Sequence, residues 1–436
     1  MAFATPLPPA GSRTAAPRPH WRTRLLRFLV VAGPGLIVMV ADNDAGAVST
    51  YTQAGAQYGT HLLWVLLTLL PVTYFVQEMV ARLGIATGQG HAAMIYQRFG
   101  TWWGRFSLFD LLLVNFLTLV TEFAAIALAA QAAGVPPVLA VPLAAAGLVA
   151  LVGTGSYRRW ERMTLGLCAL SLGWFWLALA ARPEWGHVLW HSAVPDLPAG
   201  GLTGSLVFLV IAIVGTTIAP WQLFFQQSCV ADKRLRFADL GAARLDTLIG
   251  AIAVVAFAGC MMLVGDALHR AGGAYRDPAQ MAGALAPLLG RAGSGLILVL
   301  MCNAALLGAT AISLSSAWAW GEVMGGRTTL EARMSEAPRF YAVYALCVAA
   351  AAALVLIPGA PLQAIILGVQ VLAGVMLPSA IVFLQLLLND TELLGSRFVN
   401  RRWNNWVNWT VIGVLFGLSL ILAAQVLLPG LAATAT

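Results

Sequence analysis

The sequence predicts an all-α membrane protein built from two inverted repeats, and three observations support that prediction. Hydrophobic residues make up 60% of the 436 residues and charged residues only 10%, with a mean hydropathy of +0.81. A soluble domain carries about 25% charged residues. Apolar runs of about 20 residues, the length that crosses a bilayer, recur along the chain. Two of these runs are interrupted by polar residues, and they lie five helices apart.

We expect eleven membrane helices joined by short loops. Their expected ranges are about 29–58, 61–88, 104–133, 136–153, 159–181, 202–230, 241–268, 292–322, 338–357, 362–388 and 405–428. Residues 28–436 then form one membrane domain, because no polar stretch is long enough to fold alone. Residues 1–27 are rich in Pro, Ala and Arg and lack the apolar core of a signal peptide, so we expect a disordered cytoplasmic tail.

The first expected helix contains the stretch around which the rest of the chain is organised. Its apolar run is broken by Asp42, Asn43 and Asp44, with Gly46 just beyond. A charged side chain at the bilayer centre costs roughly 2.5–3.5 kcal/mol on insertion scales. Gly46 is expected to let the backbone leave helical geometry, which frees carbonyls and amides to line a cavity. The pattern therefore predicts a broken helix that holds a cation.

Acidic residues in the next two helices are open to more than one interpretation. Glu78 lies one helical turn before Arg82, and that spacing predicts an ion pair. Glu122 lies in the middle of the third helix. It is interpreted either as a structural acid or as a group that lines the exit path or carries a residual proton route.

Basic residues set the expected orientation. With the N-terminus in the cytoplasm, all but four of the 25 Lys and Arg residues fall in inner segments, as the positive-inside rule requires. The four exceptions are Arg182, Arg270, Arg276 and Arg291. The outer loop after the fifth helix holds Trp185 and Trp190, which we interpret as an interfacial aromatic belt.

The sixth expected helix carries the second interruption. Gly215 and Pro220 interrupt its apolar run, and the polar residues Thr216, Thr217 and Gln222 lie around the break. Interrupted spans at corresponding positions of two halves indicate a midplane binding site in inverted-repeat transporters. Helices one to five and six to ten are therefore expected to be the repeats, and an odd repeat length inverts one relative to the other. The eleventh helix is an addition. The seventh helix carries both Arg244 and Asp246, and Asp246 is expected to belong to an inner network.

The candidate metal-binding residues are oxygen donors at the two breaks and in nearby spans. They are Asp44, Asp42, Asn43, Gln222, Thr216 through its backbone carbonyl, Gln226 and Gln370. Sites built only from oxygen suit magnesium, manganese and calcium. Structural alternatives remain open, because Asp44 could cap a helix, Asn43 could satisfy the backbone, and the glutamines could bridge helices.

Longer motifs in the chain resemble the Nramp metal transporters. The motifs are GPGLIVMVADNDAGAV and QAGAQYG in the first helix, QEMVARLGIATG in the second, VGTTIAPWQLFFQQS in the sixth and GVQVLAGVMLP in the tenth. The resemblance places Gln370 where the family has a glutamine near the metal. It implies a LeuT-like fold with broken helices one and six, and transport of a divalent metal by alternating access.

The two signature motifs depart from that family. Its DPGN signature reads DAGA at residues 44–47, and its MPHN signature reads APWQ at residues 219–222. The family's asparagine, methionine and first histidine thereby become Ala47, Ala219 and Trp221. This pattern resembles the Nramp-related magnesium transporter branch, whose members are described as carrying magnesium or manganese without proton coupling.

The departures alter the expected chemistry of the site. The family's second histidine falls on Gln226, and its acidic pair in the third helix is reduced to Glu122. Loss of a thioether removes a soft ligand, and the small alanines leave room for a partly hydrated magnesium ion. Without histidines in the sixth helix, no obvious relay titrates near neutral pH. We therefore expect import of Mg²⁺ first and Mn²⁺ second, without proton coupling.

Other functions are less compatible with the sequence. An ion-coupled transporter of a small organic solute is the main alternative on the same fold. The chain has no GxxxxGK[ST] loop, HExxH motif or hydrolase elbow, so we expect neither an enzyme nor a cofactor. The net charge of +7 comes from arginines in short loops and does not indicate a nucleic-acid partner. The expected partners are the metal substrate and the lipid bilayer, for a monomer in the inner (plasma) membrane.

Overall fold

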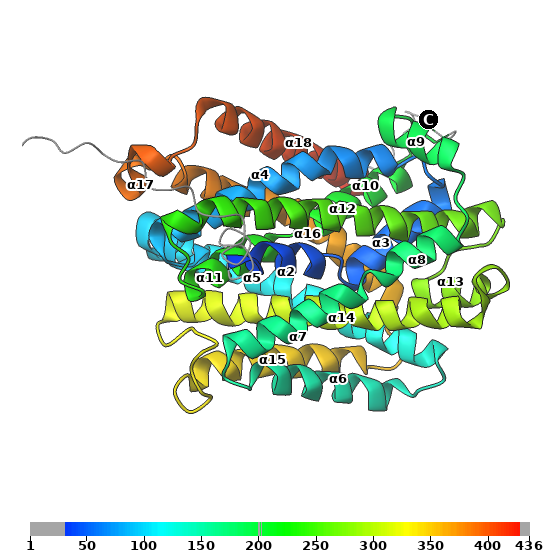
Figure 1. Ribbon diagram of the computed structural model, residues 1–436, viewed down its shortest axis with the longest axis horizontal. Coiled ribbons are helices and arrows are strands. Elements are labelled where there is room, and N and C mark those ends of the chain that lie inside the picture. Colours follow the sequence, from blue (N-terminus) through cyan, green and yellow to red (C-terminus); the bar gives the residue numbers. More distant parts are fainter. Residues whose placement is uncertain (1–30, 199–200, 202, 428–436) are drawn as a thin grey trace, which may run out of the picture.

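The computed structural model describes residues 31–198, 201 and 203–427, and this part of the chain is helical without a β-strand (Figure 1). The expected tail at residues 1–27 lies outside the described residues. The first repeat consists of α2 (Pro34–Ala41), α3 (Ala45–Tyr58), α4 (Leu63–Thr87), α5 (His91–Ala132), α6 (Pro137–Val152), α7 (Tyr157–Leu170) and α8 (Gly173–Ala180). The second consists of α10 (Gly204–Thr217), α11 (Pro220–Asp232), α12 (Leu240–Arg270), α14 (Ala286–Met324), α15 (Pro338–Val355) and α16 (Leu362–Leu387).

The remaining helices lie in the connections and at the end of the chain. They are α9 (Trp185–Ala193), η1 (Phe237–Asp239), α13 (Pro278–Ala284), α17 (Thr391–Phe398) and α18 (Arg402–Leu427). The sequence did not predict α9 and α13, which fall in expected outer loops. The start of α13 is explained by its residues, because the side chain of Asp277 accepts from the Gln280 amide at 2.8 Å and Pro278 occupies the first turn.

The expected membrane spans are reproduced as helices, but α18, at the expected eleventh span, is not among the described helices that are long and apolar enough to cross a membrane. In the described residues, eight helices are long and apolar enough to cross a membrane, and α6 is a shorter apolar helix. The expected span at 159–181 is formed by two helices, α7 and α8, which meet at Ser171 and Leu172. The expected span at 29–58 is likewise divided, into α2 and α3.

The two repeats pack against each other in a reciprocal way. Both parts of the first broken helix, α2 and α3, lie along α12 (Figure 1). Helix α11 of the second broken helix packs against α4. The equivalent helices α5 and α14 also pack together and carry equivalent kinks. Gly100 and Gly290 have φ angles of 85° and 70°, which glycine adopts without strain. Each kink separates a short leading helix from the span, so the helices begin earlier than the predicted residues 104 and 292.

Polar contacts hold one end of α2 against α12. The carboxylate of Asp246 accepts from the backbone amides of Gly33 at 3.2 Å, Gly35 at 2.7 Å and Leu36 at 3.3 Å. These amides belong to the start of α2 and have no partner within the helix. Asp246 therefore stabilises the start of α2.

A separate ion-pair network lies on the neighbouring helices. Glu78 pairs with Arg82 at 3.4 Å, which confirms the spacing argument, and with Arg244 at 2.8 Å. Asp246 was expected to belong to an inner network, and it binds the backbone of α2. Arg244 of the same helix is not its partner and pairs with Glu78 instead.

Candidate metal site at the helix breaks

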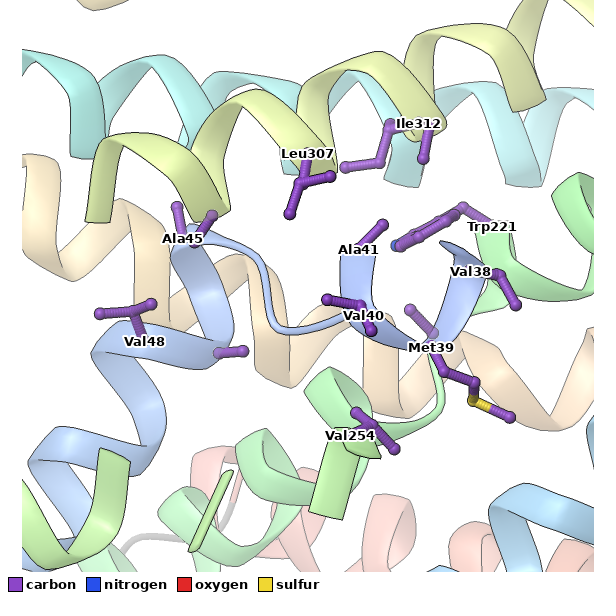
Figure 2. Packing of buried hydrophobic residues seen from close by; sticks show 14 of the residues in the cluster. Val38, Met39, Val40, Ala41, Ala45, Val48, Trp221, Val254, Leu307 and Ile312 are labelled. Carbon is purple, nitrogen blue, oxygen red and sulfur yellow. The ribbon is translucent and has the colours of Figure 1, made fainter. Parts of the chain in front are cut away.

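The first break consists of three residues between α2 and α3. Figure 2 shows this non-helical link running from Ala41 to Ala45. The side chain of Asp44 accepts from the Ala47 amide at 2.9 Å, so Asp44 is the N-cap of α3. Gly46 was predicted to break the helix, but that prediction was wrong, since Gly46 lies inside α3.

The second break is equally short. Helix α10 ends at Thr217 and α11 begins at Pro220, which leaves Ile218 and Ala219 outside both helices. Pro220 occupies the first helical position, where its missing N–H is not needed. The predicted interruption at Gly215 was wrong, because Gly215 is part of α10.

Both misread glycines have the same structural role, which is to make room for Gln370 of α16. A Cβ atom at Gly46 would lie 1.6 Å from Nε2 of Gln370, and one at Gly215 would lie 2.2 Å from its backbone oxygen. Gln370 is therefore wedged between the two broken helices. Its side-chain Nε2 has no hydrogen-bond partner among the described residues.

Asp42 is the most unusual residue of the break. It is 1% exposed, and neither carboxylate oxygen has a hydrogen-bond partner within the described part of the chain. Its surroundings include the charged side chain of Asp44 and the side chain of Gln222. A buried carboxylate is strongly destabilising unless a cation or a proton compensates it. The structure therefore leaves a place for positive charge at Asp42.

Glu122 of α5 was predicted only as a group of the exit path or of a proton route, and it completes an acidic cluster with Asp42 and Asp44. Its Oε2 accepts from the Ala45 amide at 3.1 Å, and its side chain interacts with that of Asp44. Its Oε1 is buried and has no partner in the residues that the structure describes. Gly308 of α14 faces the pair, since a Cβ there would lie 2.7 Å from Cβ of Asp44 and 2.9 Å from Cδ of Glu122.

Gln222 is held in a fixed orientation beside this cluster. Its Oε1 accepts from Nε2 of Gln77 at 3.0 Å and from the Ala219 amide at 3.2 Å. A backbone N–H only donates, so the Ala219 contact identifies the oxygen end of the amide. The nitrogen end of Gln222 is then the end left free to donate, to Asp42 or to a metal-bound water. The role of Gln77 was not predicted.

Of the other predicted donors, Asn43 lies in the first break and Thr216 near the end of α10, whereas Gln226 lies within α11, beyond its first turn. Asn43 donates to the Val254 carbonyl at 3.2 Å, and Gln226 donates to Oγ1 of Thr247 at 3.1 Å. In the described structure, the side-chain oxygens of Asn43, Gln226 and Thr216 are buried and lack partners. Unpaired buried oxygens are rare in folded proteins, so these oxygens are candidates to bind a cation or an ordered water.

Apolar and aromatic side chains cover the break on the side of α14. Figure 2 shows Trp221, Leu307 and Ile312 around the link that joins Ala41 to Ala45. Trp221 is fully buried, and its carbonyl accepts from Oγ of Ser315 on α14 at 3.1 Å. Such a wall excludes water and strengthens electrostatic interactions inside it.

These residues together provide a set of oxygen donors around the two breaks. Asp42, Asp44 and Glu122 supply three buried carboxyl groups, and amide and hydroxyl oxygens lie on the two broken helices. Carboxylate and carbonyl oxygens are the ligands of hard divalent cations. Such a site favours a hard divalent cation, and its three carboxyl groups disfavour an anionic solute.

Comparison with known proteins agrees with this chemistry. The family model described as natural resistance-associated macrophage protein-like, Nramp, matches residues 35–425. The divalent metal cation transporter MntH of Ralstonia nicotianae is 30% identical over 425 residues, covering 94% of this chain and 93% of that protein. The divalent metal cation transporter MntH 1 of Pseudomonas aeruginosa is 28% identical over 430 residues, covering 91% and 92%.

Solved structures show the same fold. A crystal structure of the Eremococcus coleocola manganese transporter, in complex with an aromatic bis-isothiourea compound, has a TM-score of 0.76 at 21% identity, covering 94% of this chain and 89% of that one. Mhp1, a nucleobase-cation-symport-1 family transporter in a closed conformation, has a TM-score of 0.55 at 14% identity, covering 93% of each chain. The fold is therefore LeuT-like, and on the match of its family model and its full-length relatives this chain belongs to the Nramp family.

Proposed function

We propose that this chain transports divalent metal cations, Mg²⁺ first and Mn²⁺ second, into the cytoplasm by alternating access. One observation carries the proposal most directly. The Asp42 carboxylate is buried beside Asp44, and neither of its oxygens has a partner among the described residues. A cation that enters from either side would supply the missing charge, and the two helix breaks would supply further oxygens.

The choice of a hard ion rests on the donor set. Ala219, next to Pro220 at the second break, provides no sulfur, and the charged ligands near it are carboxylates. Thioether and imidazole ligands favour borderline transition metals, while carboxylate and carbonyl oxygens favour magnesium and manganese. Magnesium keeps several of its waters, so the free nitrogen end of Gln222 would hold a metal-bound water.

We further propose a plasma-membrane (inner-membrane) location with the N-terminus in the cytoplasm and a monomeric protein. The distribution of basic residues supports this orientation. Arg158, Arg162, Lys233 and Arg234 line one cavity at the end of the bundle where α2 begins. With that end in the cytoplasm, the membrane potential would favour metal import by roughly 4.6 kcal/mol per 100 mV for a divalent ion.

Uptake is proposed to proceed without obligatory proton movement. The second broken helix has Trp221 and Gln226 at the positions that resemble the family's histidines. The contact of Asp44 with Glu122 favours proton coupling, because two adjacent carboxylates readily share a proton. Proton movement is therefore measured together with metal uptake.

Flux into proteoliposomes tests the proposal. The wild-type protein is reconstituted with a magnesium-sensitive dye and, in parallel, a pH dye, under a set membrane potential. Asp42→Asn and Asp44→Asn remove a charge at the break, and asparagine at position 44 still caps α3. Asp110→Asn is the matched control, since Asp110 is a part-buried acid of α5 that bonds to Oγ of Ser379 on another helix.

We expect the wild-type protein to show saturable Mg²⁺ uptake that Mn²⁺ inhibits. The rate of uptake should fall about tenfold or more in Asp42→Asn and Asp44→Asn and should be unchanged in Asp110→Asn. Normal uptake in Asp42→Asn and Asp44→Asn would overturn the metal-site proposal. Lumenal acidification that follows metal uptake and disappears in Glu122→Gln would overturn the uncoupled mechanism. Uptake of an organic solute, with no metal flux, would support the alternative function instead.

A further inference from the structure

A cluster of two histidines and one aspartate lies at the opposite end of the bundle from the start of α2. His61 precedes α4, His191 belongs to α9, and Asp196 lies in the segment between α9 and α10. One ligand atom from each of these residues lies within 4.8 Å of the other two. In Figure 1, α9 lies beside one end of α4, which brings these separate segments together.

The geometry suits a small metal ion. Oδ2 of Asp196 lies 2.9 Å from Nδ1 of His61 and 3.6 Å from Nε2 of His191. The imidazole rings of the two histidines have centroids 4.2 Å apart. A tetrahedral ion with bonds of about 2.0–2.1 Å requires ligand atoms about 3–3.5 Å apart, so only small rotations separate these groups from a coordinating arrangement.

The three residues are also held in place by their neighbours. Nδ1 of His191 lies 2.6 Å from Oγ1 of Thr60, so its Nε2 is the nitrogen left to face Asp196. The indole of Trp64 donates to the backbone oxygen of Asp196 at 3.1 Å. A bond to the second ring nitrogen and a fixed ligand backbone are the supports that metal-binding histidines and carboxylates require.

The surroundings favour a cation. A cavity of about 240 Å³ adjoins the cluster, and its lining includes His61, His191 and Glu184. Asp266 and Arg270 also line this cavity, but they pair with each other at 2.8 Å, so their charges cancel.

We propose that His61, His191 and Asp196 form a second divalent-metal site, with a preference for borderline transition ions such as Zn²⁺ and Co²⁺. Two imidazoles and one carboxylate are the donor set that such ions prefer, in contrast to the oxygen donors at the helix breaks. With three protein ligands, water completes the coordination from the solvent side. The exposed fractions of 35% for His61 and 41% for Asp196 leave that side open.

The site has a structural consequence. The connection between α8 and α10 joins the two repeats, and Asp196 is part of it. His61 belongs to the turn between α3 and α4. An ion coordinated by both Asp196 and His61 would link the connection between the repeats to the first repeat at this end of the bundle. This inference does not depend on the proposed transport of Mg²⁺.

Cobalt binding to the full-length protein tests the inference. Purified Asp44→Asn protein in detergent is titrated with Co²⁺, so that the site at the helix breaks is weakened, and visible absorption and bound metal per chain are measured. His191→Gln, His61→Gln and Asp196→Asn are added one at a time in this background. His187→Gln is the matched control, because His187 lies on the same helix and is 71% exposed beside Glu184.

We expect one tightly bound Co²⁺ per chain with the intense absorption of tetrahedral coordination. Each ligand variant should weaken binding by about tenfold or more, while His187→Gln should not. Absence of stoichiometric Co²⁺, or equal binding in the three ligand variants and their parent, would overturn the inference. Loss of binding in His187→Gln equal to that in His191→Gln would overturn the ligand assignment. Magnesium flux is measured separately, so its failure would leave these outcomes unaffected.

Discussion

The carboxylate of Glu122 accepts a hydrogen bond from the backbone amide of Ala45 at 3.1 Å, although 77 residues separate the two along the chain. Ala45 is the first residue of α3, so its amide has no partner inside the helix. The contact joins the middle of α5 to the start of α3 and places a second carboxylate beside Asp44. Glu122 thus has two roles: it accepts a hydrogen bond that holds the start of α3, and it supplies a carboxyl group to the candidate metal site.

Substitutions at Glu122 should separate these two contributions. Glu122→Gln keeps an oxygen that can accept from Ala45 but removes the charge, so we expect near-normal thermal stability and metal affinity reduced about tenfold, or about 1.4 kcal/mol. Glu122→Ala also leaves the buried amide unpaired, which costs about 1–3 kcal/mol of stability. Melting in detergent and metal titration measure the two effects. Equal affinity in wild type and Glu122→Gln would contradict a role for the charge.

Gly308→Ala should damage the site through contact alone. Its Cβ would lie 2.7 Å from Asp44 and 2.9 Å from Glu122, closer than side chains normally approach. We expect a loss of stability of about 1–3 kcal/mol and a large loss of metal flux. Gly295→Ala, on the same helix and with no atom within 4 Å of its added Cβ, is the control and should be neutral or slightly stabilising. Similar flux in the two variants would count against the close packing.

Gly46→Ala tests whether Gln370 acts as a wedge or as a ligand. The new methyl group would collide with Nε2 of Gln370 at 1.6 Å, so flux and stability should both fall. Adding Gln370→Ala to Gly46→Ala removes the collision. Full recovery of flux would show that Gln370 contributes packing only. Gln370 lies beside both broken helices, so we expect it to contact the metal as well. In that case the double variant should recover thermal stability but not metal flux.

Asp246→Ala should release the start of α2 from α12. Three backbone amides, those of Gly33, Gly35 and Leu36, would lose their acceptor. We expect hydrogen exchange in residues 33–41 to rise by about tenfold or more, which corresponds to loss of about 1–3 kcal/mol of local stability. Glu78→Gln removes ion pairs at the same end without touching α2 and serves as the control. Unchanged exchange in Asp246→Ala would contradict this stabilising role.

Ala219→Met should alter the preference among metals. Methionine would place a thioether beside the second helix break, and sulfur favours soft ions. We expect the uptake of Cd²⁺ relative to Mg²⁺ to rise at least about fivefold, with some loss of stability because Ala219 is buried. Ala219→Leu adds similar volume without sulfur. A rise in the Cd²⁺ ratio for the leucine variant as well would show that space, rather than sulfur, sets selectivity.

The helices could be predicted because apolar runs of the right length define them, whatever they pack against. The kinks at Gly100 and Gly290 were missed because the prediction relied on apolar runs. Each glycine lies between a short helix and a span, and a hydropathy pattern does not report a positive φ angle. The outer helix α9 was likewise read as a loop, because only part of its surface is apolar.

The site was predicted in part. The acids at residues 42 and 44 stood out because carboxylates in an apolar span require compensation. Gly46 and Gly215 were misread because a glycine in a membrane span indicates either a break in the helix or close packing against a neighbouring helix. The amino-acid sequence alone does not distinguish the two. The pairing of Glu122 with Ala45 depends on how α5 crosses α3, which no local pattern encodes.

The contacts that α12 makes with the first broken span bear on how the chain is synthesised. A segment divided into α2 and α3 and carrying two aspartates partitions poorly into lipid by itself. The groups that accept hydrogen bonds from the Gly35 amide and from the Asn43 side chain, Asp246 and the Val254 carbonyl, lie 211 residues later in the chain. The nascent first span should therefore remain loosely inserted, and dependent on insertion factors, until α12 leaves the ribosome.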